Sequence, residues 1–244
     1  MIVLSVDPGT TWTATTLLDL DAETILGRWY LPNPQMALVI SRVSAGEDSG
    51  NYYEMESPDK NRTIICDHKI RMDQGICESF KKLPVPQYLV MEMVSNYSQT
   101  VGRSVFETCM WSGRFIELFQ CGQYLRTGVD KMNYTLITRT QSRSNITGTS
   151  RCGDAQVNRA LLDRVGEKGT KKYPGPMYGM KSDLYAALAV GLTFKDLEAE
   201  YQAMAADPVK AKRVMAGKLK IKPFWVQLEA DGGDQTLAWP ITKS

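Results

Sequence analysis

The sequence predicts an α/β fold, in which strands and helices share one core. The first three strand-like runs follow one another through links short enough for hairpins, as in an antiparallel meander. Later in the chain, strand-like runs alternate with stretches of helical periodicity. The predicted strands cover residues 2–6, 13–20, 26–31, 88–94 and 134–138, and the predicted helices cover 67–83, 103–120, 154–165 and a stretch that opens near 182.

The composition of the 244 residues, 43% apolar and 23% charged, is that of a soluble globular protein. No apolar run approaches the roughly 20 residues of a membrane span. The N-terminus lacks the basic region and cleavage site of a secretion signal. We therefore expect a cytoplasmic protein with no membrane partner.

The cysteines and the single histidine exclude several kinds of site. Five cysteines without CxxC spacing, an odd number, indicate reduced thiols and no disulfide framework. With His68 as the single histidine, Ser-His-Asp catalysis and a His-rich zinc site are disfavoured. A zinc site made of Cys66, His68 and Cys77 would lack an evident fourth ligand.

The formal net charge is only +2, but the basic residues are unevenly placed. Residues 139–172 hold eight basic and three acidic side chains, and residues 209–222 hold six basic and no acidic ones. Such separated basic stretches suit a polyanion partner. A solvated helix face would account equally well for either stretch alone.

The first strand ends at a carboxylate. The β-branched run Ile2–Val6 has the pattern of a strand buried on both faces, and Asp7 follows before the turn Pro8-Gly9. A carboxylate in such a place is unfavourable unless it holds a cation or accepts hydrogen bonds. The simpler alternative is that Asp7 caps the turn through its own side chain.

Two more carboxylates stand in informative positions. Glu92 interrupts the apolar run Tyr88–Val94, so it needs a cation or metal partner unless this strand lies at a sheet edge. Asp183 opens a helix after the N-cap candidate Ser182, and the alanines that follow would let this helix lie close to a sheet. Asp183 would then project over the end of the sheet, although a capping role explains a first-turn Asp equally well.

The remaining stretches are less regular. Pro32-Asn-Pro34 is expected to break the meander, and residues 42–66 are an irregular insertion. Gly122 is the expected stop of the helix from 103 to 120. Residues 139–152 are a Ser/Thr/Arg-rich stretch, and residues 168–179 are a loop. Asp154 suits the N-terminal end of the next helix dipole.

This order of elements resembles the RNase H-like fold, a mixed five-stranded sheet with helices on both faces. In that fold the first and fourth strands are adjacent and parallel, so the resemblance implies that Asp7 and Glu92 lie side by side. Carboxylates hold Mg²⁺ ions, and a pair of such ions activates water and stabilises the leaving oxygen in phosphodiester cleavage. That chemistry requires neither histidine nor cysteine.

Within this group, the chain resembles the RuvC-type Holliday-junction resolvases, particularly those of bacteriophages. The resemblance spans most of residues 1–193 and rests on five segments in the same order. These are Ile2–Thr10 with Asp7, Val90-Met-Glu92, Trp111-Ser-Gly-Arg114, Gly148–Val157, and Asp183 with Ala186–Val190.

The resemblance implies a metal-dependent endonuclease that resolves four-way or other branched DNA by paired symmetric nicks with 5′-phosphate ends. Its catalytic and metal-binding residues would be Asp7, Glu92 and Asp183, with two Mg²⁺ ions per site that Mn²⁺ could replace. Paired nicks require two sites and hence a homodimer. The helix 103–120 is the candidate interface, although its apolar stripe could equally pack within one subunit.

One position departs from the family. RuvC-type helices commonly carry a second acid one turn before the last catalytic Asp, and here that position is Met180. Either three carboxylates suffice or another acid such as Asp154 completes the site. Three are favoured, because Asp154 is more simply a helix-start residue.

The resemblance also implies which residues contact DNA. Arg143, Arg151, Lys171 and Lys172 would bind phosphates, which gives affinity more than sequence readout. In this family an aromatic residue just after the catalytic Glu stacks at the opened junction. Tyr97 could stack similarly, although the matching position is Ser95.

We therefore expect a catalytic domain at residues 1–194 and a basic, helical C-terminal extension at 195–244. An actin-like or sugar-kinase-type ATPase is one alternative, because Asp7–Thr11 also resembles the first phosphate loop of those enzymes. A non-catalytic protein that binds branched DNA is another. A third is a nuclease acting on flaps, forks or RNA–DNA hybrids.

Overall fold

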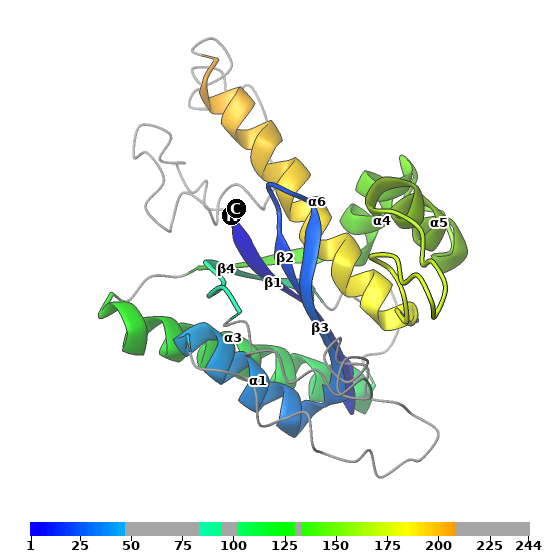
Figure 1. The fold of residues 1–244 in the computed structure, drawn as a ribbon. Coiled ribbons are helices and arrows are strands. Elements are labelled where there is room, and N and C mark those ends of the chain that lie inside the picture. Colours follow the sequence, from blue (N-terminus) through cyan, green and yellow to red (C-terminus); the bar gives the residue numbers. More distant parts are fainter. Residues whose placement is uncertain (47–82, 94–101, 130–132, 208–244) are drawn as a thin grey trace.

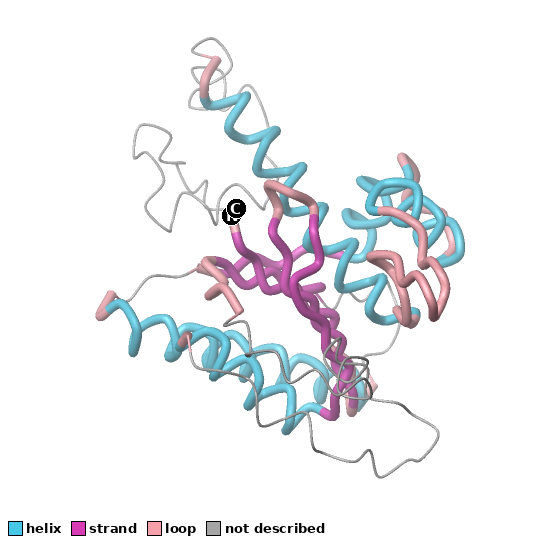
Figure 2. The backbone as a smooth tube through the Cα atoms, in the orientation of Figure 1, coloured by secondary structure: helices cyan, strands magenta, loops and turns pink. Residues whose placement is uncertain are grey.

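The computed structural model describes residues 1–46, 83–93, 102–129 and 133–207, and a five-stranded sheet forms the centre of this part of the chain (Figures 1 and 2). The strands are β1 (Ile2–Asp7), β2 (Trp12–Asp19), β3 (Thr24–Pro32), β4 (Tyr88–Met93) and β5 (Tyr134–Thr138). Their order is β3-β2-β1-β4-β5. The first three pair antiparallel, whereas β4 is parallel to both β1 and β5. The predicted mixed sheet of the RNase H-like fold is thus confirmed.

Helices cover both faces of the sheet (Figure 1). They are α1 (Asn33–Ala45), α3 (Arg103–Thr127), α4 (Arg139–Thr147), α5 (Asp154–Val165) and α6 (Ser182–Ala205). Helices α1 and α3 pack in one core with Leu4 and Val6, and α5 and α6 pack in the other core with Val3. Neighbouring residues of β1 therefore face opposite cores, which explains the uninterrupted apolar run at the start of the chain.

The meander ends at Pro32, as expected of Pro32-Asn-Pro34, but the chain continues directly into helix α1, which the sequence did not predict. Proline is tolerated in the first turn of a helix, where its missing N–H has no intrahelical partner. The Asn33 amide donates to the backbone oxygens of Gly9 and Thr10, both at 3.0 Å, and so fixes the helix start against the β1–β2 turn. Residues 42–45 of the expected insertion belong to this helix.

Several sequence-based predictions fall on residues that the structure does not describe. The rest of the insertion (47–66), the predicted helix 67–83 apart from Leu83, and Tyr97 lie outside the described residues. Cys66, His68 and Cys77 also lie outside them.

Helix α3 continues through Gly122, where it was expected to stop, and ends at the left-handed cap Gly128. Gly122 has a packing role instead. A Cβ atom at this position would lie 2.0 Å from Ser44 Oγ and 3.0 Å from the backbone nitrogen of Ala45. The absent side chain lets α1 and α3 approach closely.

Helix α4 was not expected, because its sequence is rich in serine, threonine and arginine. It begins directly after β5 through a capping box at Thr138. The Gln141 N–H donates to Thr138 Oγ1 at 3.2 Å, and the Thr138 N–H donates to Gln141 Oε1 at 2.9 Å. This cap stabilises a helix whose composition alone does not indicate one.

Helix α6 packs closely on the sheet, as its small residues predicted. Ala187 and Ala189 are buried, and a Cβ at Gly191 would lie 2.3 Å from Leu18 Cδ1. The helix continues beyond residue 194, with Leu197 and Tyr201 in the same core. The expected boundary at 194/195 therefore falls inside α6, residues 208–244 of the expected extension lie outside the described residues, and the division into domain and extension stays a prediction. Among the described residues, no helix is long and apolar enough to cross a membrane.

An ion-pair network joins α5 and α6 to the β2–β3 turn. Arg164 contacts Glu23 and Asp196, each at 2.7 Å, and Lys195 Nζ lies 2.9 Å from Glu23 Oε1. These bonds, with Arg164 as the main cause, lower the pKa of Glu23 to about 2. The network fixes the far end of α5 relative to α6 and hence the wall of the site described next.

Candidate active site

Two of the predicted carboxylates stand on neighbouring parallel strands. The register places Val6 of β1 opposite Met91 of β4, and Asp7 and Glu92 are the next residues on each strand. Because Val3 and Val90 pack in the core with α6, the two-residue period puts Asp7 and Glu92 on this same face. Since β4 lies between β1 and β5, the alternative of an edge strand for Glu92 is wrong.

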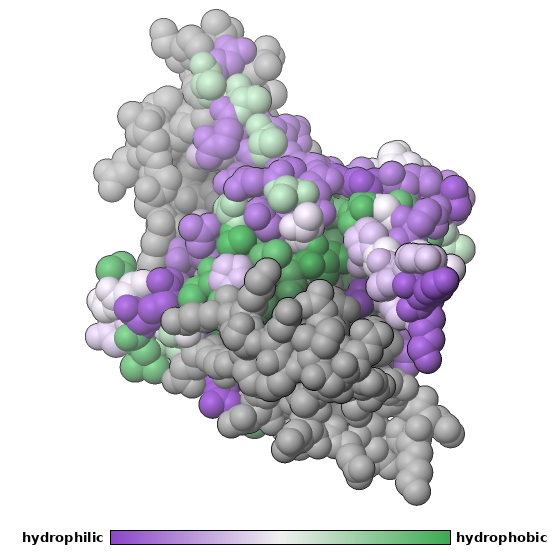
Figure 3. Space-filling model, viewed as in Figure 1, coloured by the Kyte–Doolittle hydropathy of each residue, from purple (hydrophilic) through white to green (hydrophobic). Residues whose placement is uncertain are grey.

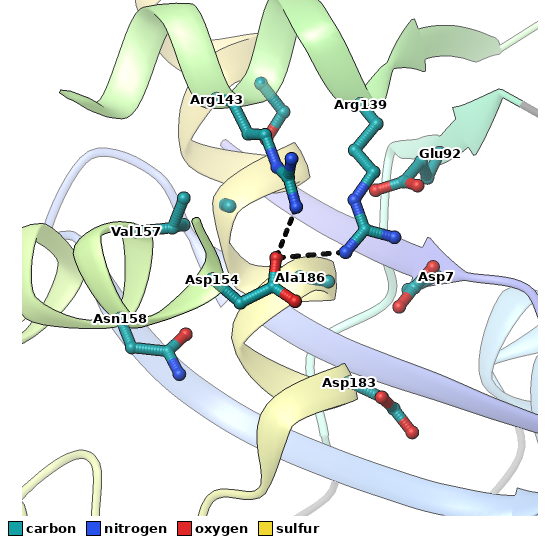
Figure 4. A pocket seen from close by; sticks show the side chains of 11 residues that line it. Asp7, Glu92, Arg139, Arg143, Asp154, Val157, Asn158, Asp183 and Ala186 are labelled. Carbon is teal, nitrogen blue, oxygen red and sulfur yellow. Dashed lines mark hydrogen bonds and ion pairs between the residues drawn. The ribbon is translucent and has the colours of Figure 1, made fainter. Parts of the chain in front are cut away.

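The third carboxylate comes from the first turn of α6. Asp183 lies one turn before Ala186, and both line the same pocket as Asp7 and Glu92. Helix α6 packs on the sheet, and its first turn brings Asp183 into the lining of the pocket that also contains Asp7 and Glu92 (Figure 4). Three residues separated by up to 176 positions in the sequence thus line one pocket.

The opposite wall of the pocket is formed by α4 and α5. Helix α4 begins where β5 ends, and its positions i, i+3 and i+4 face the pocket, as do the corresponding positions of α5. The residues on this wall are Arg139, Ser142, Arg143, Asp154, Val157 and Asn158. The pocket therefore combines a carboxylate side with a side that carries two arginines (Figure 4).

The carboxylate side carries more negative charge than its surroundings neutralise. Burial raises the pKa of Asp7 to about 8, and repulsion from Glu92 and Asp183 adds to this effect. Burial also raises the pKa of Glu92, which the charges of Arg139 and Arg143 oppose. Clustered acids with raised pKa values are typical of functional sites, where substrate or a cation compensates the charge.

The donor set has the chemistry of a site for hard divalent ions. Three carboxylates supply the oxygen ligands that Mg²⁺ prefers, and Mg²⁺ usually retains several waters beside one or two carboxylates. In the described part of the chain, however, there is no group of three or more His, Cys, Asp or Glu side chains whose arrangement could already hold a metal ion. Asp7, Glu92 and Asp183 would have to draw together around a cation. Their roles as metal ligands and catalysts stay predictions.

Arg139 is a pocket residue that the sequence did not single out. Its guanidinium contacts Asp154 at 3.0 Å, and that of Arg143 contacts the same Oδ1 atom at 2.5 Å. Asp154 is thus more than a helix-start residue, and the hydrogen bond from Arg139 lowers its pKa. The i, i+4 spacing of the two arginines was the available signal, but it had meaning only if residues 139–147 were helical.

The other predicted DNA contacts lie elsewhere. Arg151 is exposed between α4 and α5, and Lys171 and Lys172 are exposed in the loop before α6. The visible surface over α5 and this loop is largely hydrophilic (Figure 3). Met180, at the position where the family commonly carries a second acid, is buried in the core. Besides the three predicted carboxylates, Asp154 is the only acid of the described residues that lines the pocket.

No protein-family model and no curated protein matches this sequence. Solved structures of RuvC from Thermus thermophilus are similar to it. One covers 84% of this chain and 97% of the RuvC chain at 15% identity, with a TM-score of 0.46. Another, of T. thermophilus RuvC in complex with Holliday junction substrate, covers 84% and 96% at 16% identity, also with a TM-score of 0.46. The likeness is one of fold. What the pocket does must be argued from its own residues.

Proposed function

We propose that this protein is a metal-dependent, structure-selective endonuclease that cuts branched DNA, with Asp7, Glu92 and Asp183 as the residues that hold its metal ions. One observation carries the proposal: three carboxylates from β1, β4 and α6 line a single pocket opposite two arginines. An acidic cluster beside guanidinium groups suits a phosphodiester, whose charge is bound on one side by arginine and on the other by cations.

Each part of the pocket has a separate task in this proposal. Asp7, Glu92 and Asp183 would hold two Mg²⁺ ions, for which Mn²⁺ can substitute. When bound, these ions supply an activated water and stabilise the leaving 3′ oxygen, so that the cut leaves a 5′-phosphate. Arg139 and Arg143 bind and orient a backbone phosphate. Arg151, Lys171 and Lys172 extend the basic surface that holds the DNA arms.

Resolution of a four-way junction requires two cuts, and we infer that a homodimer supplies the two sites. Helix α3 leaves large apolar side chains in solvent on the face away from its own core, with Phe106 61%, Met110 74% and Leu125 79% exposed. This face is self-complementary in an antiparallel pair of helices. If Phe106 of one copy meets Leu125 of the other, then Arg114 meets Glu117 at the centre, twice.

Charge reversal tests this pairing. We expect Arg114→Glu to weaken the dimer and the double variant Arg114→Glu/Glu117→Arg to restore it, because reversal of both charges preserves every cross-subunit pair. Analytical ultracentrifugation measures the effect. Equal association of all three proteins would exclude this interface.

The decisive experiment incubates the full chain with labelled four-way junction, flap, fork, duplex and RNA–DNA hybrid substrates in Mg²⁺ or Mn²⁺. We expect junction cleavage by the wild type, and loss of cleavage with retained junction binding for Asp7→Asn, Glu92→Gln and Asp183→Asn. A variant that still cuts at the wild-type rate removes its residue from the site. Binding without cleavage would favour the non-catalytic protein, and ATP turnover without DNA would favour the ATPase.

A further inference from the structure

The strongest polar feature of the pocket beyond the three carboxylates is a group of two arginines and one aspartate. Arg139 and Arg143 lie one turn apart on α4, and both donate to Oδ1 of Asp154, the first residue of α5. Figure 4 shows the two guanidinium groups side by side, with Arg139 extending toward Glu92 and Asp7. One carboxylate from a second helix thus sets the direction of two long, otherwise mobile side chains.

We propose that Asp154 is a positioning residue, which holds Arg139 and Arg143 as a pair that receives one phosphate of the DNA strand beside Asp7 and Glu92. This inference rests on the proposed nuclease function and deepens it. It assigns to Asp154 a role different from a fourth metal ligand, because its Oδ1 already accepts two guanidinium donors.

Energetics separates this role from a structural one. The Asp154 side chain is 62% exposed, that of Arg139 50% and that of Arg143 25%, and because the shared carboxylate lies in solvent, these ion pairs contribute little to the free energy of unfolding. Two guanidinium groups that are already held in one direction, however, lose less conformational entropy when they bind a phosphate. The group should therefore affect orientation of the reacting strand far more than folding.

The surroundings of the pair also suit a phosphate. Ser142 and Asn158, from the same wall, add a hydroxyl and an amide to the pocket lining between α4 and α5. A guanidinium pair with neutral donors nearby binds an anion by charge-assisted hydrogen bonds. The carboxylates across the pocket repel a phosphate, so the arginines must fix its position against them.

The effects of Asp154→Ala on DNA binding and on the cleavage rate distinguish a positioning role from a purely electrostatic one. Removing a negative charge makes the pocket more positive, which by itself would tighten DNA binding. Loss of positioning instead lowers the cleavage rate. Because misplacement of a reacting group lowers the rate of the chemical step, we expect Asp154→Ala to reduce kcat by about tenfold and to change KM by less than about twofold. Asp154→Asn, which keeps the shape and a hydrogen-bond acceptor, should recover part of the rate. Asp163→Ala, an exposed acid on the same helix, is the matched control.

A mutant cycle shows whether Asp154 acts through the arginines. In the Arg139→Ala/Arg143→Ala background, Asp154→Ala should have no further effect on kcat. Three results would overturn the proposal: an unchanged kcat in Asp154→Ala, an equal loss in both backgrounds, or a complete loss of activity with weakened metal binding, which would make Asp154 a ligand. Thermal unfolding verifies that each variant is folded.

A second readout keeps this test separate from that of the nuclease function. If the wild type cuts none of the branched substrates, the proposed function fails, and the same cycle is read by junction binding in Ca²⁺ at several salt concentrations. Positioning predicts that Asp154→Ala changes the salt dependence of binding only while Arg139 and Arg143 are present. The same change without the two arginines would contradict it.

Discussion

Replacing Asp7 by asparagine should abolish cleavage and yet stabilise the metal-free protein. Asparagine has nearly the shape of a protonated aspartic acid but cannot ionise. The pKa of Asp7 is raised to about 8 by burial and by the neighbouring acids, whereas an exposed aspartate has a pKa near 3.8. Between these values the unfolded chain releases a proton that the folded protein retains, so wild-type stability falls as the pH rises.

The expected magnitude follows from this pKa difference. Because pH 6 lies about two units above the pKa of an exposed aspartate, burial of Asp7 lowers the unfolding free energy of the wild type by about 3 kcal/mol at this pH. At pH 8 the loss reaches about 5 kcal/mol. Relaxation of the pocket makes both values upper bounds. The difference in unfolding free energy between Asp7→Asn and the wild type should therefore widen by about 2 kcal/mol from pH 6 to pH 8 and level off above that.

Urea unfolding at several pH values in EDTA measures the effect. Addition of Mg²⁺ should narrow the difference, because a cation stabilises the ionised wild-type site and not the asparagine variant. The matched control is Asp163→Asn, which replaces an exposed acid of α5 and should show no such pH dependence. A difference that stays constant with pH, or a variant less stable than the wild type throughout, would refute the reasoning.

Two further predictions concern the scaffold. Gly122→Ala should destabilise the protein by about 1–2 kcal/mol in urea unfolding, because the new Cβ would overlap the Ser44 side chain. Gly113→Ala is the control in the same helix. Its new Cβ meets nothing within 4 Å, so this variant should be neutral or stabilising by up to about 1 kcal/mol. Because the pKa of Glu23 is lowered to about 2 by Arg164, wild-type stability should decline as the pH falls from about 4.5 to 2, and Arg164→Met should flatten that decline. An equal loss of stability in Gly122→Ala and Gly113→Ala would contradict the first prediction. A decline of stability at low pH that is as steep in Arg164→Met as in the wild type would contradict the second.

The strands could be predicted because each combines a local apolar pattern with a clear break. β5 has the predicted bounds, and β1 ends at Asp7 as expected. The order in the sheet came from the resemblance in element sequence, and the observed pairing of β1 with β4 confirms it. Those two strands place Asp7 and Glu92, so the core of the candidate site could be predicted from the sequence.

The helices α1 and α4 could not be predicted, because tertiary contacts and caps override weak local signals there. Two prolines concealed the start of α1, where the Asn33 side chain binds the β1–β2 turn. Serines and threonines concealed α4, which its Thr138 cap stabilises. Gly122 resembled a stop because sequence cannot distinguish a glycine that ends a helix from one that admits a neighbouring helix.

The same reasoning explains why Arg139 was missed although Asp7 was found. Asp7 conflicts with its local surroundings, since a carboxylate at the end of a buried strand is unfavourable unless it holds a cation or accepts hydrogen bonds, and this conflict marks it as a candidate site residue. Arg139 conflicts with nothing in a polar stretch, and its meaning arises only when α5 brings Asp154 to it. A charged residue in an apolar segment can be recognised from the sequence. The residues that neutralise its charge can be recognised only from the three-dimensional structure. The raised pKa of Asp7 shows that Arg139 supplies only part of that compensation in the metal-free protein, which is the physical reason to expect cations in this pocket.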